Sequence, residues 1–150
     1  PKSVHGVLVE GLDNCLIKFS RCCTPVPGDP IVGFITRGLG VSIHRSDCVN
    51  YRRDADTGRW IDVSWSEHTN DTYSAEIRLL SDERSGFVMD IATILNSLNA
   101  KVRSLSAHDT GKGTSIAVIL VDVHDLNELQ SIMGKLQTIR GLREIARSGE

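Results

Sequence analysis

Residues 22–48 read CCTPVPGDPIVGFITRGLGVSIHRSDC, and this stretch decides the fold of the first half of the chain. Two adjacent cysteines begin it, and the spacing His-x-x-x-Cys ends it. Residues 25–30 must turn, because each proline fixes φ and glycine supplies positive φ. The apolar segments 31–35 and 40–44 then predict a β-hairpin around residues 36–39.

Further strands are expected on both sides of this hairpin. Residues 15–21 alternate between apolar and polar side chains, with Cys15 on the apolar side, which predicts a half-buried strand. Residues 60–65 alternate in the same way. Ser46 is expected to cap one helical turn over residues 48–51.

The polar stretch 66–71 (SEHTND) is expected to join two modules, residues 1–66 and residues 72–150. The hydrophobic periodicity of the second module predicts strand 72–80, helix 85–99, strands 102–108 and 115–123, helix 126–139 and strand 142–147. The order βαββαβ is that of the ferredoxin-like fold. The predicted fold class is therefore α+β, with a small β-rich cysteine-containing module followed by a ferredoxin-like domain.

Composition narrows the functional classes. The 150 residues carry a formal net charge of -2, so the overall charge does not indicate a nucleic-acid-binding protein. A hydrophobic content of 40% is typical of a globular protein, and no apolar run approaches a membrane helix. The N-terminus lacks both a signal-peptide core and an initiator Met, so we expect an excised, cytoplasmic fragment.

Four side chains of the first module are candidate ligands of a zinc ion: Cys22, Cys23, His44 and Cys48. Zn²⁺ prefers four sulfur or nitrogen ligands in a tetrahedron. The His-x-x-x-Cys end suits this geometry, since a strand end followed by a helical turn presents both groups to one ion. The adjacent pair suits it less, because neighbouring residues of a strand point to opposite faces. Both thiols reach one ion only if the backbone bends there.

Other interpretations of the cysteines stay open. One thiol of the pair could pack in the core while the other fills space near Cys48, because free cysteine is among the most buried residue types. A disulfide needs an oxidising compartment, and the absence of any sign of secretion favours reduced thiols. A catalytic pair of His44 and Cys48 lacks a recognisable third orienting group.

The stretch from Cys22 to Cys48 resembles the cysteine module near the C-terminus of long RelA/SpoT-type alarmone enzymes, also called the zinc-finger-like or ribosome-intersubunit domain. The second module resembles an ACT domain, whose acidic-Arg-x-Gly-Leu turn is matched by Asp82, Arg84, Gly86 and Phe87, with Phe in place of Leu. An ACT domain directly after the cysteine module is more specific than either motif alone. The resemblance covers nearly all of residues 8–147.

This resemblance implies contact with the ribosome. In the family this region docks between the ribosomal subunits and touches large-subunit RNA and A-site tRNA. The residues of the matching motif are Arg37, His44, Arg45 and Asp47. Arginine suits planar recognition of phosphates and bases. The alternative is that these side chains are ordinary solvated surface groups.

The resemblance also implies a ligand site, because ACT domains commonly pair side by side and hold an amino acid at the interface. The backbone N–H groups at a helix N-terminus attract a carboxylate, and Asp82 would accept the ammonium group. The expected residues are Asp82, Ser85, Gly86, Phe87, Val88, Asn99, Ala100, Lys101 and Val102. Some relatives bind branched-chain amino acids here. The alternative is a ligand-free ACT domain that docks RNA or neighbouring domains.

The function expected from the resemblance is regulatory. The chain would sense amino-acid starvation through ribosome and tRNA contact and control the catalytic domains of the same (p)ppGpp synthetase/hydrolase. The alternative is an amino-acid-sensing, dimerising module. The sequence contains no Walker-type loop, His-Asp metal pair, nucleophile elbow or acidic metal cluster, so we expect no catalysis within this fragment.

Overall fold

A computed structural model describes residues 3–9, 11, 15–38, 40–66 and 70–150. The chain divides into two compact units, one of Pro1–Asp71 with Gly149–Glu150 and the other of Thr72–Ser148. We refer to the first as the cysteine module and to the second as the ferredoxin-like domain. None of the described helices is long and apolar enough to cross a membrane.

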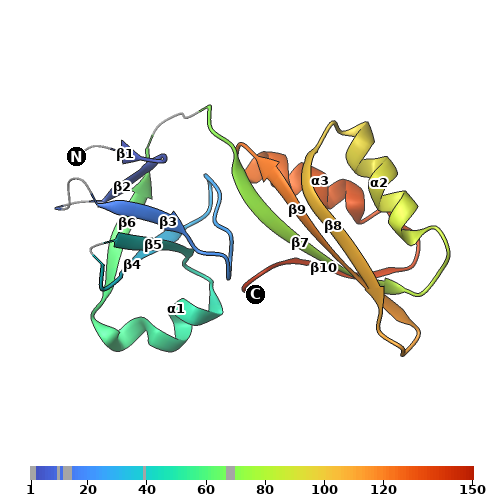
Figure 1. The fold of residues 1–150 in the computed structure, drawn as a ribbon, viewed down its shortest axis with the longest axis horizontal. Coiled ribbons are helices and arrows are strands. Elements are labelled where there is room, and N and C mark those ends of the chain that lie inside the picture. The colour runs from blue at the N-terminus through green and yellow to red at the C-terminus, as the bar shows by residue number, and fades with distance from the viewer. Residues whose placement is uncertain (1–2, 10, 12–14, 39, 67–69) are drawn as a thin grey trace. The chain divides into compact units, whose positions relative to one another are not determined.

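The cysteine module is a curled six-stranded sheet with one short helix (Figure 1). The strand order is β1-β2-β6-β4-β5-β3, in which β3 runs parallel to β5 and the other neighbours are antiparallel. Its elements are β1 (Ser3–Val4), β2 (Val7–Val9), β3 (Leu16–Phe19), β4 (Ile31–Ile35), β5 (Gly40–Arg45), α1 (Val49–Asp54), the 3-10 turn η1 (Ala55–Thr57) and β6 (Trp60–Trp65).

The predicted hairpin and flanking strands are confirmed, but the predicted helix cap is wrong. Helix α1 begins at Val49, and its N-cap residue is Cys48, whose side chain makes no capping hydrogen bond. Ser46 instead lies before the helix, where its backbone N–H donates to the carbonyl of Pro30 at 2.9 Å. Cys48 therefore stands where the strand end and the helix meet.

The core of the cysteine module is small. Four buried side chains form its centre, contributed by β2 and β5: Val7, Val9, Val41 and Ile43. Half-buried residues, including Cys15 as predicted, pack around them. Gly33 of β4 lies directly over this core, because a Cβ there would sit 2.7 Å from Cγ1 of Val41 and 2.9 Å from Cγ1 of Val63. The inside of the sheet thus has no room at this position for even one more methyl group.

The ferredoxin-like domain has the predicted βαββαβ order, with α2 and α3 against one face of a four-stranded antiparallel sheet (Figure 1). The strand order is β10-β7-β9-β8. The elements are β7 (Tyr73–Asp82), α2 (Phe87–Ser97), β8 (Lys101–Asp109), β9 (Thr114–Val123), α3 (Leu126–Leu136) and β10 (Leu142–Arg147).

The core of this domain follows from strands in which buried and more exposed side chains alternate. Along β7, the side chains predicted to face inward are buried: Tyr73, Ala75, Ile77 and Leu79. The helices add the side chains of their apolar stripes, among them Ile91 and Leu129. Helix α3 is fixed at its start by its N-cap residue Asp125, whose carboxylate accepts from the N–H of Glu128 at 2.9 Å.

Both helices are shorter than predicted, for reasons of backbone geometry. Gly86 has φ of 88° and serves as the N-cap of α2, so the helix starts at Phe87. Asn99 has φ of 53°, which ends the helical path before β8. Helix α3 ends at Leu136, and the chain turns through Gly141, where φ is 87°, into β10.

Candidate functional site

A tight turn brings the adjacent thiols to the same side of the backbone. The N–H of Thr24 donates to the carbonyl of Ser20 at 3.0 Å, and Thr24 has a positive φ of 43°. The N–H of Ser20 donates to Ile43 at 2.9 Å, which anchors the turn beside β5. The backbone therefore bends where the sequence left the bend open, and Cys22 and Cys23 no longer alternate as strand residues do.

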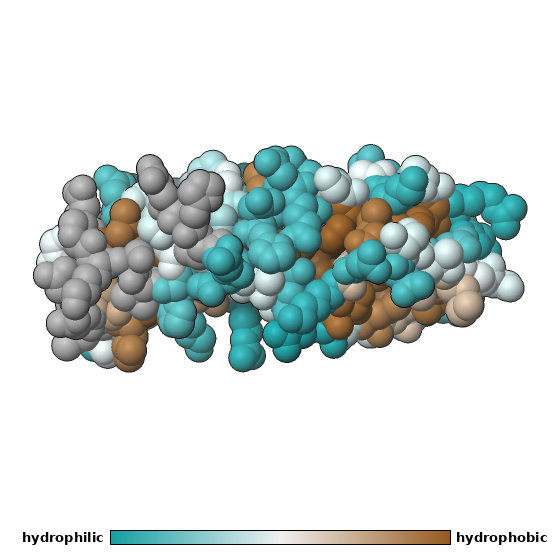
Figure 2. All heavy atoms as spheres, turned by 90° about the horizontal axis from the view of Figure 1, so that it is seen from above, coloured by the Kyte–Doolittle hydropathy of each residue, from teal (hydrophilic) through white to brown (hydrophobic). Residues whose placement is uncertain are grey.

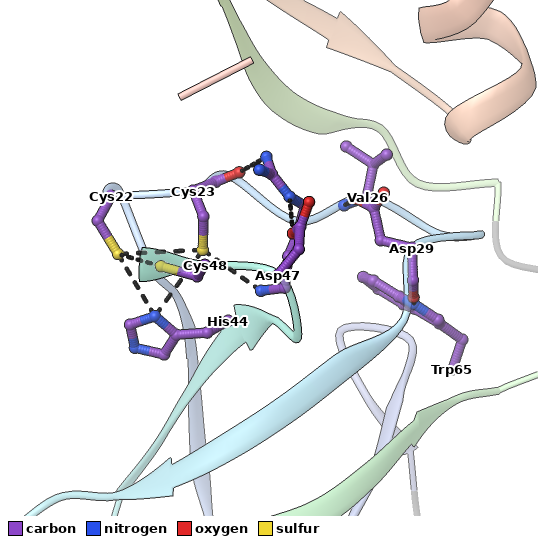
Figure 3. Close-up of polar contacts among 9 residues, drawn as sticks. Cys22, Cys23, Val26, Asp29, His44, Asp47, Cys48 and Trp65 are labelled. Atoms are coloured by element: carbon purple, nitrogen blue, oxygen red, sulfur yellow. Dashed lines mark hydrogen bonds and ion pairs between the residues drawn. The ribbon is translucent and has the colours of Figure 1, made fainter. Parts of the chain in front are cut away.

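The other two predicted ligands come from β5 and the start of α1. His44 is the second-last residue of β5, and Cys48 precedes α1. The N–H of Cys48 donates to the carbonyl of Arg45 at 3.0 Å, which closes the turn between them. Figure 3 shows the three sulfur atoms and the imidazole ring converging from these separate elements.

The spacing of the four groups fits a tetrahedral metal ion. The Sγ atom of Cys22 lies 3.9 Å from Sγ of Cys23, 3.5 Å from Sγ of Cys48 and 3.3 Å from Nδ1 of His44. The Cys23 sulfur lies 3.8 Å from the same nitrogen. With metal–sulfur bonds of about 2.3 Å, neighbouring vertices of a tetrahedron are roughly 3.8 Å apart. All four ligand atoms lie within 4.8 Å of one another, so the cluster has the dimensions of a three-cysteine, one-histidine metal site.

Hydrogen bonds around the cluster favour thiolate sulfur. The backbone N–H of Arg45 donates to Sγ of Cys23 at 3.3 Å. The hydroxyl of Ser20 lies 2.9 Å from Sγ of Cys22, and the hydroxyl of Ser42 lies 3.4 Å from Nε2 of His44. Such partners orient the ligands and satisfy the charge of a metal-bound sulfur.

The protonation states follow from burial and these contacts. Burial raises the pKa of the Cys23 thiol, since the charged form loses water. Burial also acts to raise the pKa of Cys22, but hydrogen bonds from Ser20, Asn50 and the neighbouring thiols outweigh it, and the net pKa is lowered. Burial lowers the pKa of His44 below its ordinary 6.5. A neutral imidazole at neutral pH is the form that binds a metal.

Arg45 departs from its predicted role as a surface contact. Its side chain is only 2% exposed, and its Nη1 donates to the carbonyl of Cys23 at 2.6 Å. Its Nε donates to the Asp47 carboxylate at 2.8 Å. The guanidinium thus braces the cysteine turn from inside, because a buried cation needs partners of this kind. Arg37, by contrast, is exposed on the β4–β5 turn, and Asp47 is also exposed.

An aromatic wall next to the cluster was not predicted. The Trp60 ring packs edge-on to the His44 ring with centroids 5.1 Å apart. Tyr51 and Phe34 pack on the same indole, each with centroids 4.8 Å away. The alternation of residues 60–65 indicated a strand but carried no signal for its partner across the sheet, which depends on the register of β6 with β4.

The predicted amino-acid site of the ferredoxin-like domain lies around the start of α2. A cavity of about 290 Å³ is lined there by Gly86, Phe87, Val88 and residues at the end of β8, including His108 and Asp109. Arg84 braces the loop, with its Nε donating to the carbonyl of Arg140 at 2.9 Å.

Not all of the predicted ligand residues meet in one copy of the domain. Asp82 forms an ion pair with Arg143 at 2.6 Å and does not line the cavity. Phe87 is 3% exposed, so it is mainly a core residue. Residues 99–102 lie at the far end of α2, which is roughly 16 Å long at 1.5 Å per residue. Within one copy the two groups of predicted residues are therefore separated.

Apolar side chains also reach the surface over α2 (Figure 2). Val88 is 44% exposed, Met89 68% and Leu98 38%, and Val102 of β8 is 41% exposed. Contiguous apolar patches on a protein surface often mark interaction sites, whereas single exposed apolar residues are common.

The chain thus combines a cysteine module that holds a cluster able to bind a metal ion with a ferredoxin-like domain. The family model of the RelA/SpoT RIS domain matches residues 7–66, and that of the ACT domain matches residues 69–147. The chain belongs to the RelA/SpoT family and carries its RIS and ACT domains in tandem.

Named relatives agree with this assignment. The chain is 38% identical over 138 residues to a GTP pyrophosphokinase of Escherichia coli, which covers 89% of this chain and 18% of the relative. It is 33% identical over 142 residues to a GTP pyrophosphokinase of Myxococcus xanthus, covering 95% and 19%. The chain thus spans less than a fifth of the length of these relatives. Among solved structures, the ACT domain from GTP pyrophosphokinase of Chlorobium tepidum matches with a TM-score of 0.46 and 18% identity, over 51% of this chain and 97% of that one.

Proposed function

We propose that this chain is the regulatory C-terminal region of a (p)ppGpp synthetase/hydrolase of the stringent response. The observation that carries the proposal is the RIS domain followed directly by the ACT domain, in a chain whose relatives are named GTP pyrophosphokinase. Catalysis would take place in other domains of the same cytoplasmic protein, which these two modules control.

The metal that we propose for the cluster is zinc. Zn²⁺ suits three thiolates and one imidazole in a closed tetrahedron, and Cys22, Cys23, His44 and Cys48 supply that set. When bound, the ion supplies cross-linking rather than chemistry, tying the cysteine turn to β5 and α1. Elemental analysis of protein purified without chelator should find one zinc per chain. A content far below one would remove the metal from the proposal.

The partners that we propose for the cysteine module are large-subunit ribosomal RNA and A-site tRNA. Support comes from Arg37, which is exposed on the β4–β5 turn. Its guanidinium group can contact RNA phosphates directly because it is not buried. Arg45 is buried and so holds the module in shape, which makes it unsuitable as a test of contact.

Co-sedimentation with ribosomes tests this assignment. Arg37→Glu should weaken binding of the chain to ribosomes that carry A-site tRNA, and Arg78→Glu, an equal charge change on the exposed face of β7, should not. Full binding by Arg37→Glu would take this arginine out of the interface, and no binding by the unaltered chain would reject ribosome sensing altogether.

A second function is favoured by the cavity at the start of α2. Its volume of about 290 Å³ and its place at a helix N-terminus suit a small amino acid with an aliphatic side chain. Because residues 99–102 are remote within one copy, we propose that they reach the ligand from a second copy in an ACT dimer, where the exposed apolar residues of α2 and β8 would be covered.

Calorimetry separates this function from a ligand-free docking role. We expect saturable heat with valine, leucine or isoleucine and none with lysine. Val88→Thr should weaken binding through the cavity, and Val102→Thr should weaken it only if a second copy completes the site. No heat at millimolar ligand would leave docking as the role of the ACT domain.

A further inference from the structure

An open groove runs along the cysteine module beside the metal-type cluster. It has a volume of about 710 Å³, within the range of roughly 300–1,000 Å³ typical of ligand sites. The groove lies over the parallel pair β3 and β5, with the β4–β5 turn at one end and the cysteine turn at the other. The proposed contact residue Arg37 does not line it, and the cluster borders it only through Cys22 and His44.

The charges along this groove are of one sign. Lys18 of β3 and Arg21 of the cysteine turn line it, and both are exposed. None of the described residues that line it is an aspartate or glutamate. In a chain with a formal net charge of -2, this is a local positive strip, which attracts an anionic backbone.

Neutral hydrogen-bonding groups and an apolar surface complete the groove. Ser42 of β5 and Asn50 of α1 present a hydroxyl and an amide to it. Leu16 lines it with a side chain that is 76% exposed and so offers an apolar surface to a ligand. Cations for phosphates, an apolar face for a base and polar groups for its edge are the elements that bind single-stranded nucleic acid.

We propose that this groove binds an unpaired stretch of RNA, with Lys18 and Arg21 on its phosphates and Leu16 against a base. This proposal deepens the ribosome- and tRNA-binding function and rests on it. Cys22 and His44 belong to both the groove wall and the cluster, so the metal-bound cluster fixes the wall and RNA binding requires it.

The groove is tested with fluorescein-labelled octaadenylate RNA and the zinc-loaded 150-residue chain. Reversal of either groove cation, in Lys18→Glu or Arg21→Glu, should lower the affinity about tenfold and reduce the log–log salt slope by about one for each phosphate interaction removed. Lys112→Glu is the matched control, because it makes the same charge change on an exposed turn of the ACT domain and should bind as the unaltered chain does. Amide NMR spectra check that each variant keeps the fold. In the unaltered chain, the amide signals of Ser42 and Asn50 should shift when RNA is added.

The same variants are then taken to ribosome co-sedimentation. Loss of binding in both assays by the groove variants alone supports the proposal. If the unaltered chain binds ribosomes and the groove variants bind equally well, the groove proposal is wrong while the proposed function stands. If no form binds ribosomes or RNA, both fall. Displacement of the RNA by equimolar free GTP would assign the groove to a free nucleotide and overturn the RNA assignment.

Discussion

The two domains of this chain reach stability by different means. In the ACT domain, alternating strands and two amphipathic helices bury a continuous apolar core, with Ile77, Ile91, Ile119 and Leu129 enclosed. In the RIS domain four side chains of β2 and β5 form the buried centre, and the cysteine turn is held by polar contacts and sulfur atoms. Domains of this size often need a staple beyond the hydrophobic effect. We therefore expect metal binding at the cluster to stabilise the RIS domain, as packed helices stabilise the ACT domain.

The largest expected effect follows from breaking the cluster. Cys48→Ser, or removal of the metal with a chelator, should unfold the RIS domain, because structural zinc contributes on the order of 10 kcal/mol to small domains. Cys15→Ser is the matched control, since Cys15 is half-buried outside the cluster. NMR dispersion would collapse for residues 15–66 and persist for residues 72–147. A RIS domain that stays folded in Cys48→Ser would refute the comparison.

The second prediction concerns a change that should destabilise the ACT domain and leave the RIS domain unaffected. Ile119→Ala removes a fully buried side chain from the middle of β9 and should destabilise the ACT domain by about 2–5 kcal/mol. Metal content and RIS-domain signals should not change. Met89→Ala, at a 68% exposed position of the same domain, should cost less than about 0.5 kcal/mol in urea unfolding. Equal effects of the two changes on the free energy of unfolding would mean that the apolar core is not the main source of this domain's stability.

A smaller effect probes the limited core of the RIS domain. Gly33→Ala forces a methyl group against Val41 and Val63 and should cost about 1–3 kcal/mol by overpacking. Gly38→Ala meets nothing within 4 Å and serves as the control. Thermal unfolding of the zinc-loaded chain measures both. A neutral Gly33→Ala would show that the strands around β4 relax more easily than their spacing indicates.

The smallest expected effect concerns pH. The pKa of His44 is lower in the folded RIS domain than its ordinary 6.5, so as the pH falls the unfolded chain takes up this proton first. Stability from the neutral imidazole is therefore present above about pH 6.5 and lost below it. Urea unfolding of the metal-loaded chain between about pH 5.5 and 7.5 should show RIS-domain stability falling as the pH is lowered. His44→Cys should lose stability more steeply, because its extra thiol is fully protonated in the unfolded chain and metal binding must release that proton too. An identical acid response in both would assign the loss to other groups.

Sequence patterns predicted most of the fold. The apolar residues of strands recur every second position and those of helices every three or four positions, and these patterns depend only on which side chains are buried. They predicted the four cluster residues but not how adjacent cysteines share one site, since that depends on the hydrogen bond that closes Ser20–Thr24 into a turn. They also failed for Arg45, whose burial depends on the carbonyl of Cys23 and on Asp47 meeting it in space. In the ACT domain, Gly86 shortened α2 through its positive φ, and Phe87 lines the cavity with a side chain that is almost wholly buried in the core.

The pairing of β2 with β6 bears on the order in which the RIS domain folds during translation. Val7 pairs with Trp65, so β2 lacks this neighbour until the chain has been synthesised as far as Trp65. The cluster, by contrast, needs only residues up to Cys48, and the loop that it closes from Cys22 is shorter. Because short loops close before long ones, the β4–β5 hairpin would form first during translation, metal capture by the cluster would follow, and the pairing of β2 with β6 would come last.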